Sequence, residues 1–327
     1  MKCDIITFGS ATRDIFLKSK NFRIVGEKKF ITGQGLCLSL GSKIDVADIY
    51  FSIGGGGTNT AAAFAKQGFK VAFCGLVSQD KLGKGLVKEL KKIGIKTDFI
   101  SQTKNKITNH SVILSSDGQE RTILVYRGAS GELTKKDIPW QKLKKARWFY
   151  LAPLSGKSAR IFGALVDFAK KNKIKVAANP GNSQLSLPKN QLKKILKKVD
   201  LLILNQEEAS LLANISFQKE KEIFKKLDQI ISGICLMTKG PEGVAVSDGK
   251  YLYKAGILKT KVVDRTGAGD AFASGFLSGL IKTNDIVFAI QLGMANSASC
   301  LRKYGAKEGL LEKGERFEKV KVKREKL

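Results

Sequence analysis

Two carboxylates frame a glycine-rich turn late in the chain, in a run that could bind and act on a phosphate. The run reads Asp264-Arg265-Thr266-Gly267-Ala268-Gly269-Asp270. Apolar residues precede it as in a strand, and the residues after it have helical spacing, so the turn would open a helix. The free backbone N–H groups of a helix start bind anions, and Asp270 in the first turn could take a proton from an attacking hydroxyl. The alternative is an ordinary helix start with an acidic first turn; the second carboxylate, Asp264, favours the functional interpretation.

Several other chemistries are excluded by what the sequence lacks. Neither G-x-x-x-x-G-K-[ST] nor G-x-G-x-x-G after a strand is present, so a nucleotide would need another phosphate-binding device. The single histidine, His110, lies in a strand-like run and rules out His-based triads and multi-His metal sites. The five cysteines are scattered without a C-x-x-C pair, which is typical of reduced thiols in a cytoplasm.

The chain is strongly basic, with 58 Lys and Arg residues against 29 Asp and Glu residues and a formal net charge of +29. Basic surfaces bind nucleic acids through counterion release. The basic residues are spread along the whole length, however, without an Arg-rich arm or an aromatic RNA-binding signature. We therefore expect attraction of small anions such as nucleotides and no nucleic-acid binding. No apolar run approaches the roughly 20 residues that span a bilayer, and the first residues resemble a strand more than a signal peptide. We expect a cytoplasmic protein without membrane interaction.

The elements that must position the glycine-rich turn alternate between strands and helices. Short apolar runs, typical of parallel strands buried on both faces, occur at residues 5–8, 71–75, 148–151, 175–178, 201–204 and 234–237. Helical spacing occurs at residues 58–67, 82–92, 159–172 and 191–198. This alternation predicts βαβ crossovers and hence an α/β fold with a mostly parallel central sheet.

Two stretches, residues 13–52 and 98–131, contain β-type sequence without a convincing helix. In the second, Asp117-Gly118 separates two alternating runs, which is a hairpin signal. We predict that these two insertions form a small β lid on one α/β core. The core would comprise residues 1–12, 53–97 and 132–311. Residues 312–327 are predicted to form a charged C-terminal tail, frayed or helical.

Five motifs in sequence order resemble those of the ribokinase-like (PfkB) carbohydrate kinase family. The run at 264–270 is similar to the family's D-T-x-G-A-G-D signature. The others are GGGGTNTAAA at 54–63, LVSQDKLG at 76–83, NQEE at 205–208 and TKGPEG at 238–243. Together with flanking sequence they span residues 9 to about 306. The resemblance implies a three-layer α/β/α ribokinase-like fold with a small β-sheet lid, and an ATP-dependent kinase.

The resemblance also implies roles on the nucleotide side. Asp270 would activate the acceptor hydroxyl, while the amides of the Gly267-Ala268-Gly269 turn would hold the negative charge on the transferring phosphoryl group. The nucleotide-binding residues would be Asn205, Thr238, Gly240, Asp264, Thr266 and Asn296. Glu208 would help to hold Mg²⁺ through water. The alternatives are a helix N-cap followed by a surface glutamate for the 205–208 motif, and a solvent-facing helical residue for Asn296.

On the acceptor side, the resemblance implies that Asp14, Gly55 and Asn59 bind the sugar hydroxyls. The alternatives are a strand-end turn residue for Asp14 and a simple tight turn for the glycine run. Four consecutive glycines cost chain entropy, which favours a close backbone approach to a neighbour. Thr12 stands where ribokinase-type sequences usually have Asn, and Gly56 where Lys is often found; both departures weaken the case for ribose itself.

The sequence thus predicts phosphoryl transfer from Mg·ATP to a hydroxymethyl group of a sugar. A nucleoside (adenosine-type) kinase shares the motifs and is the near alternative. A non-catalytic sugar sensor or a basic nucleic-acid-binding protein is the alternative from another class. The resemblance leaves K⁺ use open, because the family binds K⁺ largely through backbone oxygens, and it suggests a homodimer through the lid.

Overall fold

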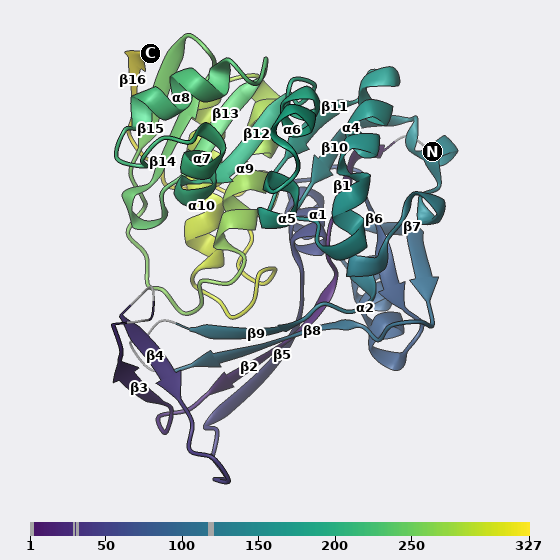
Figure 1. The fold of residues 1–327 in the computed structure, drawn as a ribbon, viewed down its shortest axis with the longest axis vertical. Helices are drawn as coiled ribbons and strands as arrows, with labels where there is room; N and C mark the ends of the chain where they lie inside the picture. Colours follow the sequence, from purple (N-terminus) through teal and green to yellow (C-terminus); the bar gives the residue numbers. More distant parts are fainter. Residues whose placement is uncertain (1–2, 29, 31–32, 117–120) are drawn as a thin grey trace.

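Nearly continuous apolar runs form the strands of a large central sheet (Figure 1). The structure is a computed structural model, and it describes residues 3–28, 30, 33–116 and 121–327. Ten strands of the described chain form this sheet, in the order β16 (Val322–Lys326), β15 (Tyr251–Ala255), β14 (Val244–Ser247), β13 (Ile234–Thr238), β12 (Leu201–Asn205), β11 (Lys175–Ala178), β10 (Ala146–Leu151), β1 (Cys3–Phe8), β6 (Val71–Ser78) and β7 (Lys96–Thr103). From β13 to β7 all neighbours are parallel. The mostly parallel sheet predicted from the apolar runs is confirmed.

Helices cover both faces of this sheet and bury a separate apolar core on each (Figure 1). One face carries α4 (Phe162–Lys171), α6 (Lys189–Leu196), α7 (Gln206–Ala213) and α8 (Glu220–Asp228), with the short helices α3 (Trp140–Leu143) and α5 (Asn182–Leu185) beside them. The other face carries α1 (Gly56–Lys66), α2 (Lys81–Lys92), α9 (Ala268–Thr283) and α10 (Ile286–Cys300). The result is the predicted three-layer α/β/α architecture. No helix in the described ranges is long and apolar enough to cross a bilayer.

The end of the chain differs from the expected frayed or helical tail, because its last residues form the edge strand β16. β14, β15 and β16 extend the sheet in antiparallel order, with Ala255 opposite Val322. Val320 is buried against the core, and the Lys254 Nζ atom lies 3.0 Å from a carboxylate oxygen of Glu325 on the neighbouring strand. The strand has four consecutive charged and exposed residues, 323–326, which suit a solvent-facing sheet edge.

A second, four-stranded sheet lies beside the main body (Figure 1) and is called the lid sheet below. Its order is β5 (Asp48–Gly54), β2 (Thr12–Lys18), β8 (Asn109–Ser115) and β9 (Thr122–Tyr126), and β3 (Arg23–Gly26) with β4 (Gln34–Cys37) forms a separate ribbon. The antiparallel strands β8 and β9 flank the predicted hairpin turn; the turn itself, Asp117-Gly118, lies outside the described residues. β7 pairs with β6 in the main sheet, so the second insertion leaves that sheet only after Thr103, later than the predicted residue 98.

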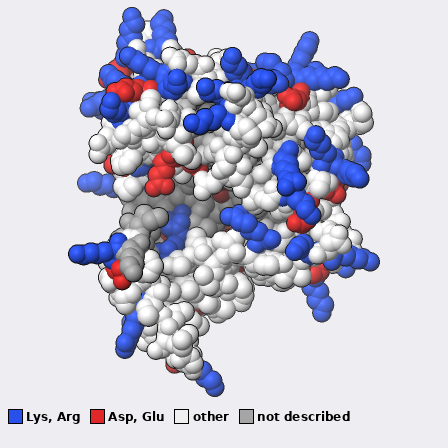
Figure 2. Space-filling model, in the orientation of Figure 1, with Lys and Arg blue, Asp and Glu red and all other residues white. Residues whose placement is uncertain are grey.

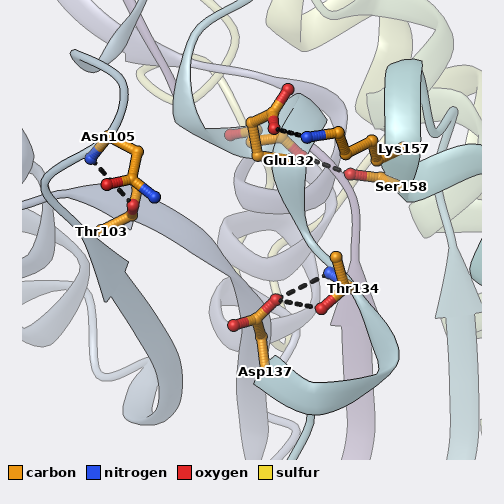
Figure 3. A network of polar contacts seen from close by, with 8 residues as sticks. Thr103, Asn105, Glu132, Thr134, Asp137, Lys157 and Ser158 are labelled. Carbon is orange, nitrogen blue, oxygen red and sulfur yellow. Dashed lines mark hydrogen bonds and ion pairs between the residues drawn. The ribbon is translucent and has the colours of Figure 1, made fainter.

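A polar network fixes the segment that returns from the lid sheet to the core (Figure 3). Lys157 Nζ lies 2.6 Å from Glu132 Oε2, and Ser158 Oγ donates to the Ser130 carbonyl oxygen at 2.5 Å. Ser130 Oγ in turn accepts from the backbone N–H of Ala11 at 3.1 Å. This network therefore ties the return segment to the start of β2, the strand that carries the predicted acceptor-binding aspartate.

Candidate active site

The glycine-rich turn opens helix α9, as predicted. Gly267 is its N-cap with φ 78°, a left-handed conformation that favours glycine. A Cβ atom on Gly267 would also collide with Ala306, so the turn packs directly on the segment that follows α10. The Ala268 N–H makes only a long bond of 3.4 Å, to the carbonyl of Arg265. The helix start therefore has the geometry of an anion site.

Asp270 lies in the first turn of α9 in a desolvated position. Burial raises the pKa of its carboxyl group to about 6, against the lowering effects of Asn59 and Lys307. Asn59 Nδ2 donates to Asp270 Oδ2 at 2.8 Å. The other oxygen, Oδ1, lies 3.6 Å from where a Cβ of Gly56 would stand. The carboxylate is thus held at one oxygen, while its second oxygen faces the glycine run.

Asp14 sits on β2 against the same glycine run. Its side chain is 5% exposed, and its carboxylate occupies the space that a Cβ of Gly54 would need. Burial raises the pKa of Asp14, while the Lys307 charge and a hydrogen bond from Ser111 lower it. Gly55 has φ 95°, and a Cβ there would lie 2.5 Å from the Ser10 carbonyl oxygen. The close approaches inferred from four consecutive glycines are therefore made by Gly54 to Asp14, by Gly55 to Ser10 and by Gly57 to Gly9 and Phe73.

Lys307 is a buried residue of this cluster that the sequence patterns did not single out. Its Nζ atom donates to Asn59 Oδ1 and to the Ile53 carbonyl oxygen, both at 2.6 Å. Burial lowers the pKa of its ammonium group to about 8, although the charges of Asp14 and Asp270 oppose the shift. It lies directly after Ala306, the residue on which Gly267 packs, and no sequence motif includes it.

A pocket of about 560 Å³ lies next to the start of α9 and contains the predicted Thr238 and Gly240. Ala268 and Gly269 form part of its wall, so the anion site opens into it. Its other walls are mostly apolar and come from the 257–260 segment and from α9 and α10. Those lining residues include Ile257, Leu258, Phe272, Met294, Ala298 and Leu301. Figure 2 shows a hollow between the main body and the lid sheet, and basic side chains scattered over much of the visible face.

Four of the predicted nucleotide-binding residues do not line this pocket: Asn205, Asp264, Thr266 and Asn296. The Asp264 carboxylate is 7% exposed; it accepts from the Thr266 N–H and Oγ1 at 3.0 and 2.9 Å and from the Gly305 N–H at 2.9 Å. It therefore holds the glycine-rich turn against the segment after α10. Asn296 is fully buried, donates to the Ala271 carbonyl oxygen at 2.7 Å and accepts from the backbone of residue 311. Its neighbours at 294 and 297 line the pocket instead.

Asn205 and Glu208 cap helix α7 reciprocally. Asn205 Oδ1 accepts from the Glu208 N–H at 2.7 Å, and Glu208 Oε2 accepts from the Asn205 N–H at 2.8 Å. The helix-cap alternative is thus present in the structure, and it leaves the second carboxylate oxygen of Glu208 available. Asn205 lies opposite Thr238 in the β12–β13 register, which places the cap beside the strand that ends at the pocket.

Asp80, from the motif at 76–83, has a structural role. Its carboxylate accepts from the Gly83 N–H at 2.7 Å, which caps α2, and from Thr108 Oγ1 and N–H at 2.6 and 2.8 Å. Burial raises its pKa, but the hydrogen bonds from Thr108 and Gly83 outweigh it and lower the pKa to about 2. Asp80 thus anchors the chain entering β8 to the core.

Comparison with known proteins agrees with this arrangement. Residues 5–313 match the pfkB family carbohydrate kinase. A ribokinase of Lactococcus lactis is 31% identical over 82% of this chain and 85% of its own length. A ribokinase of Haemophilus influenzae is 27% identical over 97% of this chain and 98% of its own length. The structure of Arabidopsis thaliana ribokinase, complexed with ribose and ATP, superimposes with a TM-score of 0.77 at 20% identity, covering 95% of this chain and 96% of that chain.

The fold and the match over nearly the whole chain define a ribokinase-like kinase. The chain belongs to the pfkB family of carbohydrate kinases. It is a phosphotransferase with an alcohol group as acceptor. The family, the fold class and the enzyme class expected from the sequence are confirmed, whereas the roles of individual residues stay predictions.

Proposed function

We propose that this protein transfers the γ-phosphoryl group of ATP to a hydroxymethyl group of a sugar. One observation carries the proposal, the position of Asp270. On one side of it lie the acceptor-side residues Asn59 and Gly56. On the other side lies the start of α9, where Ala268 and Gly269 line a pocket of nucleotide size. A hydroxyl and a phosphate bound on the two sides would meet at this carboxylate.

In the proposed reaction, Asp270 takes the proton of the acceptor hydroxyl as its oxygen attacks the γ-phosphorus. The bond from the γ-phosphorus to the bridging oxygen breaks, and that oxygen leaves with ADP. The amides of the Gly267-Ala268-Gly269 turn stabilise the charge that develops on the transferring group. Asp14, Gly55 and Asn59 would bind the acceptor hydroxyls and orient the attacking one.

Mg²⁺ is the cofactor implied by ATP, and the residues present fit a metal held mostly by phosphates and water. In the part of the chain that the structure describes, no three His, Cys, Asp or Glu side chains converge as a metal site. Glu208, with one oxygen taken by the Asn205 N–H, can accept from a metal-bound water with the other. Mg²⁺ usually binds in this way, through few carboxylates and the substrate phosphates. When bound, it would neutralise phosphate charge. K⁺ use stays a prediction of the resemblance alone.

The proposal is tested by measuring ATP consumption against a panel of sugars and nucleosides, with wild type and Asp270→Asn side by side. The proposal is supported if the wild type turns over a sugar and the Asp270→Asn variant does not. If no sugar supports turnover, or if the variant is equally active, the sugar kinase proposal is wrong. Steeply salt-dependent binding of DNA or RNA would favour the non-catalytic alternative.

A nucleoside acceptor is the second candidate, because an aromatic cluster lies on the acceptor side of the lid sheet. Asp14 and Phe16 share one face of β2, since strand side chains alternate. Phe16, Tyr50 and Tyr304 have ring centroids 5.9–6.3 Å apart. Such rings can stack on a nucleobase. A higher kcat/KM for nucleosides than for sugars in the same panel would favour this candidate.

The exposed surface of the lid sheet bears on the homodimer that the resemblance suggests. Large apolar side chains are exposed on the lid sheet, among them Phe51 at 61% and Leu124 at 55%, which fits a homodimer through the lid. We keep the cytoplasmic location and the absence of nucleic-acid binding as predictions.

The pKa of Asp270 predicts an acidic limit to activity. The ionised carboxylate is the base, and its pKa is raised to about 6, chiefly by burial. We therefore expect kcat to fall as the pH drops through about 6, rather than near the value of about 3.9 for a free aspartate. The measurement is kcat against pH with saturating ATP and acceptor. A rate that stays constant down to about pH 5 would contradict the assignment.

A substitution of Ile257 tests the nucleotide pocket without disturbing the buried core. This side chain lines the pocket and is 50% exposed, so Ile257→Asp should fold normally. A carboxylate there removes apolar contact and repels the phosphates, and we expect the KM for ATP to rise about tenfold, or ~1.4 kcal/mol, with the acceptor KM unchanged. Leu211→Asp, at a 65% exposed position on α7, is the matched control. Equal effects of the two variants would argue against this pocket.

A further inference from the structure

Lys307 joins the acceptor side and the catalytic side of the site from a third part of the chain. The residue follows α10, is 6% exposed, and reaches Asn59 on α1 and the Ile53 carbonyl oxygen at the end of β5. Neither the sequence motifs nor the family resemblance assigns it a role.

The hydrogen bonds run in one direction, from Lys307 through Asn59 to Asp270. An ammonium group only donates, so it must face the amide oxygen of Asn59. The Asn59 amide then has its NH₂ group turned toward Asp270 Oδ2, to which it donates at 2.8 Å. With the amide reversed, its oxygen would face the carboxylate and the hydrogen bond would be lost. Lys307 therefore selects the orientation in which Asn59 stabilises the ionised carboxylate.

Titratable groups from four elements surround Lys307. The carboxylates of Asp14 on β2, Glu89 on α2 and Asp270 on α9 favour its charged form. Burial raises the pKa of the Cys300 thiol, at the end of α10, to about 12, so this group is neutral. A buried positive charge is tolerated when such groups surround it and its donors are satisfied. In return, the ammonium lowers the pKa of both Asp14 and Asp270.

We propose that Lys307 is a positioning residue of phosphoryl transfer: its protonated ammonium orients the Asn59 amide, which holds Asp270 as an ionised base with Oδ1 free for the acceptor hydroxyl. This inference rests on the proposed role of Asp270. In this role Lys307 makes no contact with the substrate. The alternative is that Lys307 is a purely structural anchor, which stabilises the fold through its hydrogen bond to the Ile53 carbonyl oxygen.

A basic limit to activity follows from this arrangement. Lys307 must keep its proton, and burial lowers its pKa to about 8, so kcat should fall as the pH rises through about 8. Together with the acidic limit set by Asp270, the pH profile should be bell-shaped. A structural anchor would produce no such basic limit in kcat.

The test compares three lysine variants in the full chain. Lys307→Met should lower kcat about tenfold or more and move the acidic limit to higher pH, because the amide and the charge no longer hold Asp270 ionised. Lys307→Arg keeps a charge that does not titrate in this range, so it should retain more activity and lose the basic limit. Lys303→Met, at an exposed lysine on the same segment, should behave as wild type.

The outcomes separate this inference from the proposed function. If wild type turns over no acceptor, the proposed function itself fails. If wild type is active and Lys307→Met keeps its kcat and its pH profile, the positioning role is wrong. If Lys307→Met does not fold, Lys307→Arg decides, since an unchanged basic limit in that variant overturns the inference. If neither variant folds, a wild-type kcat that does not fall above about pH 8 overturns it.

Discussion

Asp270→Asn is expected to lower kcat by about 10²–10⁴-fold, the usual worth of a general base, while the protein stays folded and binds ATP. Asparagine has the shape of the carboxylate, and its Oδ1 can still accept the hydrogen bond that Asn59 Nδ2 makes to Asp270. It cannot take the proton of the acceptor hydroxyl. Because the pKa of Asp270 is raised by burial, removing the charge also removes a desolvation cost, so the variant should unfold at the same or a higher temperature.

The measurements are kcat with the best acceptor of the panel, ATP affinity by calorimetry and the thermal unfolding midpoint. Retained ATP affinity together with lost turnover would assign the defect to the chemical step. A variant that keeps more than about a tenth of the wild-type kcat would show that Asp270 is not the base.

The second large effect is expected at Gly267. An alanine there adopts the left-handed conformation (φ 78°) at a cost of about 1–2 kcal/mol, and its Cβ collides with Ala306. Relieving the collision moves the amides of the glycine-rich turn and Ala306 apart. A shift of Ala306 also displaces Lys307, the next residue in the chain. Losing one well-placed donor to a developing negative charge costs about 10²–10³-fold in kcat. We therefore expect Gly267→Ala to lose activity at least to this extent and to be less stable.

Gly249→Ala separates conformational strain from crowding. Gly249 has φ 84°, close to that of Gly267, but a Cβ there would meet no atom within 4 Å. It lies in the turn between β14 and β15, away from the pocket. This variant should lose a similar 1–2 kcal/mol, measured by denaturant unfolding, and keep wild-type kcat. Equal activities of the two variants would refute the idea that the turn must pack on Ala306.

Most helices and strands could be predicted from the sequence, because the spacing of apolar residues and the positions of glycines are local signals. The apolar run at 175–178 coincides with β11, and the helix expected at 82–92 is α2 (Lys81–Lys92). The tail was the exception. Its residues are mostly charged, and only pairing with β15 shows that they form a strand, so no local pattern could have revealed it.

The site was predictable only where motifs mark it. The glycine run and Asp270 do meet, as the two signatures implied. Asn296 was predicted for the nucleotide, yet it is buried in bonds to backbone atoms, because helical spacing alone does not tell which neighbour a side chain meets. Lys307 stayed hidden for a related reason: among 58 basic residues, its sequence context does not distinguish a buried lysine from an exposed one.

The hydrogen bonds that build the site join distant parts of the chain. Asn59 and Asp270 are 211 residues apart, and Asn59 and Lys307 are 248 apart. Contacts of such separation close large loops and form slowly in folding. A partly folded chain could therefore complete its α/β layers while Asp270 still lacks its contact with Asn59. Recovery of activity would then be among the last events of refolding, later than recovery of helical signal.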